Sequence, residues 1–271
     1  MTLAAGRYAP SPRSSLVSAF NVQLNVIGAL IMRELHTRFG RDNIGYLWVF
    51  AEPMLLAVAV AIIHAYRKSS DSSISMVAVA LCGYLTFILF RAIVLRAEGT
   101  LESNRPLLYH RMVTLLDMLL ARAVLELAST IFAFFLLMGG AIVLGFASLP
   151  ARPLWLLTGL LMMTWLAFGL SMIVCVASHV SRAFPRLLHA GMYLSLPISG
   201  AFFLMRWVPS SFRSAVEWVP LVQIEELVRY GQFADLDDRF VHLPFLVALC
   251  MGLTFVGLLA LRAIRPHIHL E

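Results

Sequence analysis

The sequence predicts an all-α integral membrane protein with six transmembrane helices. Of its 271 residues, 60% are hydrophobic and only 13% are charged, whereas about a quarter of the residues in a soluble domain are charged. Apolar stretches recur at the length of about 20 residues with which a helix crosses a bilayer, and they lack the alternation of barrel strands. Helices are expected because a spanning segment must satisfy its own backbone hydrogen bonds. The six expected spans are about 47–66, 74–95, 121–146, 154–178, 187–205 and 243–263.

Charge and hydropathy divide the chain into three parts: a cytoplasmic N-terminal segment (1–45), a six-span domain (46–265) and a short tail (266–271). Within the first part, residues 16–39 carry apolar side chains at near-helical spacing, with polar side chains elsewhere on the helical wheel. This pattern predicts an amphipathic helix on the cytosolic membrane interface, where a disordered tail is the alternative. The apolar positions are Phe20, Leu24, Ile27, Ile31 and Leu35.

Between the fifth and sixth spans, residues 206–233 are predicted to form two helices too short to cross a bilayer. Pro220 separates two short apolar faces, and Gly231 is a plausible helix stop. We expect an outward-facing hairpin that re-enters the membrane, with a hairpin on the membrane surface as the alternative. The wider connection, 206–242, is acidic through Glu217, Glu225, Glu226, Asp235, Asp237 and Asp238.

The placement of arginine sets the expected orientation. Arginines concentrate in the N-terminal segment and in the stretches 96–122, 182–186 and 262–265, and such clusters favour the cytoplasmic side. Both termini are therefore expected in the cytoplasm. This orientation accounts for the net charge of +6 better than nucleic-acid binding does.

Catalysis and metal binding are not indicated. The only lysine, Lys68, follows Arg67 rather than the glycine that a nucleotide-binding loop requires, so an ATPase site on this chain is not expected. The histidines lack the spacing of a zinc motif, and no nucleophile elbow is present. We therefore predict no catalytic residue, no metal and no cofactor on this chain.

Several stretches together resemble one family, the membrane subunits of type-2 ABC exporters for polysaccharide, and most closely the capsule-export permeases. The resemblance covers about 20–263 and is most specific before the first span. There, Glu52 before Pro53 is more similar to capsule than to O-antigen permeases. The similar stretches are Arg33-Glu34 to Gly40, Gly45 to Trp48, Glu52-Pro53, Ala121 to Glu126, Phe184-Pro185, Trp218 to Leu221 and Glu225 to Arg229.

This resemblance implies a half-transporter in the bacterial inner membrane. A second copy of the chain would complete the pore, and two separate ATP-binding subunits would hold ATP and Mg. The implied substrate is a lipid-linked capsular polysaccharide moved out of the cytoplasm, with a periplasmic adaptor or co-polymerase as a further partner and membrane lipid around the helices.

Two groups of residues are candidates for the substrate path. Aromatic rings at the entrance of the first span can pack on sugar CH faces, although an aromatic belt at the interface is the alternative. Charges inside spans are costly and usually face protein or water, and Arg122 and Glu126 would share one helix face as a possible ion pair. The candidates are Tyr46, Trp48, Phe50, Glu52, Arg91, Arg122 and Glu126.

Short, charged, cytosolic segments are the surfaces that an ATPase partner can contact, although a solvated arginine cluster is the alternative. The coupling candidates are Arg33, Glu34, Arg38, Arg41, Glu98, Glu102, Arg105, Arg111, Arg182 and Arg186.

Three other functions stay open from the sequence. One is an O-antigen or teichoic-acid exporter, the second an integral-membrane enzyme acting on polyprenyl-linked glycans, and the third a structural membrane anchor.

Overall fold

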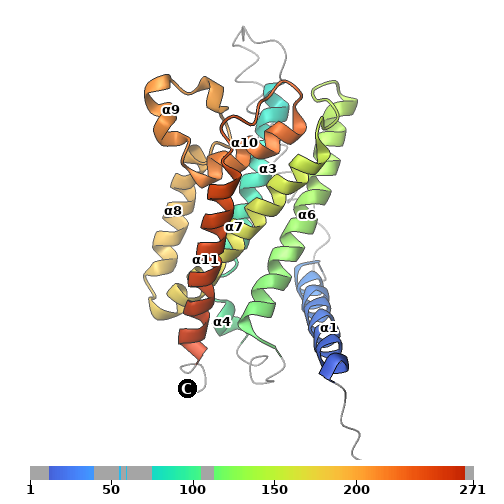
Figure 1. The fold of residues 1–271 in the computed structure, drawn as a ribbon, viewed down its shortest axis with the longest axis vertical. Helices are drawn as coiled ribbons and strands as arrows, with labels where there is room; N and C mark the ends of the chain where they lie inside the picture. Colours follow the sequence, from blue (N-terminus) through green and yellow to red (C-terminus); the bar gives the residue numbers. More distant parts are fainter. Residues whose placement is uncertain (1–11, 40–54, 56–58, 60–74, 105–112, 266–271) are drawn as a thin grey trace, which may run out of the picture.

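The computed structural model describes residues 12–39, 55, 59, 75–104 and 113–265, and the regular structure in these ranges is helical. Four of the described helices are long and apolar enough to cross a membrane: α3 (Met76–Leu95), α6 (Leu115–Val143), α7 (Pro153–Val180) and α11 (Leu243–Ile264). Successive helices α3, α6 and α7 run in alternate directions (Figure 1). Together these helices form an elongated bundle.

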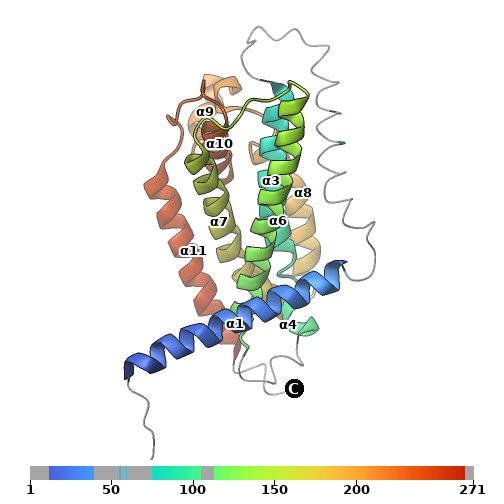
Figure 2. The same cartoon turned by 90° about the vertical axis from the view of Figure 1, so that its right-hand side faces the viewer.

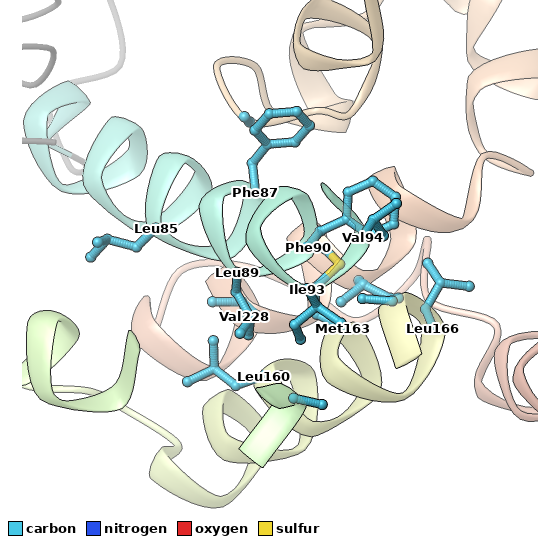
Figure 3. Close-up of a cluster of buried hydrophobic side chains, with 14 of the residues drawn as sticks. Leu85, Phe87, Leu89, Phe90, Ile93, Val94, Leu160, Met163, Leu166 and Val228 are labelled. Atoms are coloured by element: carbon cyan, nitrogen blue, oxygen red, sulfur yellow. The ribbon is translucent and has the colours of Figure 1, made fainter. Parts of the chain in front are cut away.

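The core lies where α3 and α7 meet. Leu89 and Ile93 of α3 gather with Leu160 and Met163 of α7, beside Val228 of the later helix α10 (Figure 3). All five side chains are buried. By contrast, most of the outer face of α11 is exposed and apolar, as a lipid- or protein-facing surface requires.

The expected N-terminal helix is confirmed as a helix, α1 (Pro12–Phe39), and it begins four residues earlier than expected. It lies across one end of the bundle rather than along it (Figure 2). Leu30 is buried against Met118 and Ala121 of α6, and Ile27 and Ile31 pack around this contact. Phe20 and Leu24, on the apolar face expected from the sequence, are exposed.

Two of the six expected spans are not among the four candidates. The first, 47–66, lies outside the described residues except for two isolated positions. The fifth, 187–205, corresponds to α8 (Phe184–Ile198), which has 15 residues and therefore spans only ~22 Å. It ends one residue after Pro197. A turn and the short 3-10 helix η1 (Met205–Trp207) follow.

The third expected span begins earlier than its hydropathy indicated, at Leu115 rather than near 121. Thr114 and Asp117 form a capping box, in which each residue's backbone N–H is bonded by the other's side chain. The cap extends α6 into the polar connection. Before it, α4 (Thr100–Ser103) forms a single helical turn close to α6 and α7.

The two short helices expected in 206–233 are confirmed as α9 (Ser210–Val216) and α10 (Pro220–Gln232). Pro220 lies in the first turn of α10, where its missing N–H costs no hydrogen bond. Both helices lie at the end of the bundle opposite α1 and α4 (Figures 1 and 2). α9 has no buried residue, whereas α10 is buried along most of its length against α7 and α3.

Candidate functional site

A polar cluster joins α1, α3 and α6 at the end of the bundle where α1 lies. We call this group (Glu34, Arg96, Arg122 and Glu126) the lower polar cluster. Arg122 of α6 donates from Nη1 to the backbone oxygen of Arg96 (2.7 Å) and to Oγ1 of Thr100 (2.6 Å). Its Nε lies 3.5 Å from Oε1 of Glu34 on α1. One guanidinium thus connects three elements and satisfies a carbonyl at the C-terminal end of α3.

Arg122 and Glu126, which the sequence offered as a pair on one helix, each have a partner on another element. Glu126 is buried, and its Oε1 lies 2.7 Å from Nε of Arg96. Arg122 pairs with Glu34 instead. Arg96 follows the last residue of α3. Burial lowers the pKa of its guanidinium, whereas the Glu34 carboxylate raises it and the Arg122 charge lowers it further. The cluster therefore alternates positive and negative groups across three helices.

The connection that follows α3 is bonded to three neighbouring helices. Arg33 of α1 donates to Oδ1 of Asn104 at 2.7 Å. His179, in the last turn of α7, lies 2.7 Å from Glu102, and His189 of α8 lies 2.9 Å from Glu98. The connection is therefore in direct contact with α1, α7 and α8.

The structure thus brings together several of the predicted coupling residues. Arg33, Glu34, Glu98 and Glu102 all contact neighbouring elements at this end. Arg182, in the turn between α7 and α8, and Arg186, in the first turn of α8, are exposed. Among the other predicted coupling residues, Arg38 belongs to α1, and its side chain is not described. Arg41, Arg105 and Arg111 lie outside the described residues.

Some of the predicted substrate-path residues have described contacts, and the others lie outside the described residues. Arg91 of α3 lies over the ring of Tyr193 on α8, 5.1 Å from its centroid, as a cation–π contact. Arg122 and Glu126 belong to the lower polar cluster. Tyr46, Trp48, Phe50 and Glu52 lie outside the described residues.

Sequence reasoning missed Asp117 as an anchor for α1. Besides capping α6, its carboxylate accepts a hydrogen bond from Nε2 of Gln23. The Thr114-x-x-Asp117 spacing was the available signal for the cap. The second contact joins residues 94 positions apart and left no trace in the local pattern.

A second polar centre lies at the opposite end, inside the packing of α10. We call it the hairpin clasp: Arg229 with the chain segment 200–203. Arg229 is fully buried and donates to the backbone oxygens of Gly200, Ala201 and Phe203, each at 2.7 Å. Its Nη1 also lies 3.5 Å from Oε1 of Glu226. The clasp therefore ties α10 to the turn that follows α8.

Gly83 of α3 makes this clasp sterically possible. A Cβ atom at this position would lie 2.0 Å from the Ala201 oxygen and 2.5 Å from Nη2 of Arg229. No side chain fits there without displacing backbone, so the glycine permits the close approach of α3 to the clasp.

Two of the six acids of the 206–242 connection are buried. Glu226 accepts from the backbone N–H of Met205 at 3.1 Å as well as facing Arg229. Glu225 is fully buried, and neither carboxylate oxygen has a hydrogen-bond partner among the described residues. Burial raises the pKa of Glu225 well above its ordinary 4.5, the Arg229 charge lowers it and Glu226 raises it again. These two residues therefore belong to the interior of the protein.

Metal-binding geometry is absent from the part of the chain that the structure describes, where no three His, Cys, Asp or Glu side chains are grouped to hold an ion. The three cysteines are buried and free. What the arrangement offers is two charged centres, one at each end of an apolar bundle, joined by α3.

A family model described as ABC-2 type transporter matches residues 25–233, which contain both polar centres and α3. The chain belongs to the ABC-2 transporter family. Two relatives of this ABC-2 protein are named capsule polysaccharide export inner-membrane proteins. BexB of Haemophilus influenzae is 34% identical over 89% of this chain and 91% of its own length. CtrC of Neisseria meningitidis serogroup B is 34% identical over 88% of this chain and 90% of its own.

A third relative is more distant. The polysialic acid transport protein KpsM of Escherichia coli is 30% identical over 89% of the ABC-2 chain and 94% of its own length. The likeness in all three cases runs over nearly the whole of both proteins, so it includes the lower polar cluster and the hairpin clasp alike.

Proposed function

We propose that this chain is the permease half of an ATP-driven exporter that moves lipid-linked capsular polysaccharide out of the cytoplasm across the bacterial inner membrane. Two copies of the chain form the pore, and two separate subunits bind ATP and Mg. The observation that carries the proposal is similarity over about nine-tenths of the chain to proteins named for capsule polysaccharide export at the inner membrane.

The proposed membrane topology has six spans with both termini in the cytoplasm. α8 and residues 47–66 add to the four candidate spans, and the end carrying α1, α4 and the lower polar cluster faces the cytoplasm. The arginines at this end support that orientation, because positive charge is retained on the cytoplasmic side. The same orientation puts α9 and α10 outside, where α10 re-enters the membrane against α3 and α7 and exposed α9 is free to meet a periplasmic adaptor.

Coupling to ATP follows from the contacts of the connection after α3. Closure of the ATP-binding subunits presses on this connection and on α1. Arg33, Glu98 and Glu102 join it to α1, α8 and α7, and Arg122 joins it to α6. A displacement there is passed to four helices at once, which is what opening a path between two copies requires.

The test is to purify the chain from its native host in mild detergent, identify co-purifying proteins by mass spectrometry, and measure ATP turnover. We expect a stoichiometric subunit with a nucleotide-binding loop, and ATP turnover that rises when lipid-linked capsular glycan is added. A chain that purifies alone, in a host that still exports its capsule when the gene is deleted, would contradict the proposal.

A further inference from the structure

A charged cavity lies beside the hairpin clasp, at the end of the bundle opposite α1. It has a volume of about 280 Å³, just below the range of ~300–1,000 Å³ that is typical of small-molecule sites. Four elements line it: η1, α9, α10 and the loop that follows α10. Its charged lining consists of Arg206, Arg213, Glu226, Asp235, Asp237 and Arg239.

The lining carries side chains of both charges. Glu226 is engaged by Arg229 and by the backbone N–H of Met205, so its charge is balanced from outside the cavity. Arg213 and Arg239 then face two exposed carboxylates, Asp235 and Asp237, so the cavity offers hydrogen-bond donors and acceptors together.

Arg213 is held in place with one donor unused. Its Nη2 donates to the backbone oxygen of Val208 at 2.9 Å and more weakly to that of Arg206 at 3.4 Å. Its guanidinium lies over the ring of Phe240, 5.8 Å from the centroid. Its Nε is buried and has no hydrogen-bond partner among the described residues. A buried donor left unpaired is costly unless an acceptor enters.

We propose that this cavity binds one acidic saccharide unit of the exported polymer on the outer face of the permease. The carboxylate of the sugar pairs with Arg213 and Arg239, and its hydroxyl groups donate to Asp235 and Asp237. A mixed lining of this kind favours a charged, hydroxyl-rich ring over a simple anion, because the two aspartates repel an anion that brings no donors. The inference rests on the proposed function and adds to it a site that holds the emerging chain.

The volume fits a single sugar ring rather than a segment of polymer. One unit held at a time suits a polymer in transit, since the next unit can replace it as the chain advances. Guanidinium–carboxylate hydrogen bonds supply the selectivity, because charge-assisted bonds are roughly twice as strong as neutral ones.

The test measures binding to the full-length chain purified with its ATP-binding partner in detergent. The probes are a hyaluronan hexasaccharide, in which every second sugar carries a carboxylate, and the neutral chitohexaose of the same length. Arg239→Gln is the first variant, because Arg239 is exposed and its loss should leave the fold intact. Arg213→Gln is the second. Arg262→Gln, on the exposed side of α11 and away from the cavity lining, is the matched control.

We expect the acidic hexasaccharide to bind at least tenfold more tightly than the neutral one. Arg239→Gln and Arg213→Gln should each weaken acidic binding about tenfold, the scale of a lost charge-assisted hydrogen bond, without changing neutral binding. Arg262→Gln should change neither. Equal binding of the two probes, no binding, or unchanged acidic binding in Arg239→Gln would overturn the inference. If the ATP-binding partner co-purifies in that case, the proposed function stands; if no partner appears, the proposed function fails as well.

Discussion

The two charged centres of this permease differ in how they compensate the charge of an arginine in an apolar bundle. In the lower polar cluster the arginine side chains are part-exposed, 40% for Arg96 and 16% for Arg122, and the carboxylates of Glu126 and Glu34 neutralise them. In the hairpin clasp the Arg229 side chain has no exposure, and three backbone carbonyls surround it together with Glu226, whose Oε1 lies 3.5 Å away. Water can replace a lost partner in the first centre but not in the second.

This difference indicates different mechanical roles. Ion pairs between part-exposed side chains are worth little individually and re-form readily, which suits a joint that changes shape. A buried guanidinium bonded to carbonyls cannot leave without stranding its charge. We therefore regard the lower polar cluster as the joint between α1, α3 and α6, and the clasp as the fixed attachment of α10.

The largest expected effect comes from breaking the clasp. Arg229→Leu leaves three buried carbonyls without their donor and removes the partner of Glu226, so we expect a loss of about 3–5 kcal/mol. The protein should fail to give a monodisperse peak in detergent. Arg262→Leu, an arginine-to-leucine change at an exposed site, should cost less than about 0.5 kcal/mol.

Two measurements test this prediction: thermal unfolding gives the stability of each variant, and size-exclusion chromatography in detergent shows whether it is monodisperse. Arg229→Lys should rescue little, because one ammonium cannot reproduce the planar fork that reaches three carbonyls. A stable Arg229→Leu protein with wild-type Tm would show that the clasp is not a fixed attachment.

The parts of the fold that sequence predicted well are those set by local patterns. α3, α7 and α11 appear near their expected limits because uninterrupted apolar runs determine them. Pro220 and the short apolar faces around it predicted α9 and α10 for the same reason. The start of α6 was misplaced because hydropathy does not register a capping box.

The partners of charged residues were much less predictable. Helical spacing suggested Arg122 with Glu126, but Arg96 and Glu34, far apart in sequence, hold them instead. The sequence placed Glu225 and Glu226 in an outward-facing connection and did not indicate that they are buried. Their burial depends on α3 and α7 covering both sides of α10, which no local pattern encodes.

A smaller effect is expected at the joint. Arg122→Gln removes the ion pair to Glu34 and weakens the bonds to the Arg96 oxygen and Thr100. Because Arg122 is part-exposed, we expect a loss of about 1–2 kcal/mol, at the lower end of the range for charged hydrogen bonds. The protein should still assemble with its ATP-binding subunits.

Its defect should be in coupling. ATP turnover in the assembled complex should continue while polysaccharide export, measured as surface capsule in cells, falls several-fold. Equal reductions of ATP turnover and export would instead indicate a general loss of folded protein. Unchanged export would show that Arg122 has no role in coupling.

The smallest expected effect concerns Glu225, and it depends on pH. Burial raises the pKa of its carboxyl in the folded protein, while the unfolded chain titrates near the ordinary 4.5. Below that pH Glu225 is protonated in both the folded and the unfolded state, so the difference in its pKa does not change the free energy of unfolding. As the pH rises above it, the unfolded chain releases the proton first, so the folded state loses stability until the raised pKa is reached. Arg229 offsets part of this loss.

Glu225→Gln should therefore stabilise the protein at pH 7 by about 1 kcal/mol, or a Tm increase of roughly 2–4 °C, with little difference at pH 4. Detergent melts of both proteins across this range measure the effect, and Asp238→Asn, at an exposed acid of the loop that follows α10, is the control. If wild type and Glu225→Gln differ in Tm by the same amount at both pH values, Glu225 is not protonated in the folded protein at pH 7. The clasp would then hold a second buried charge, and its contrast with the lower polar cluster would be weaker than the geometry indicates.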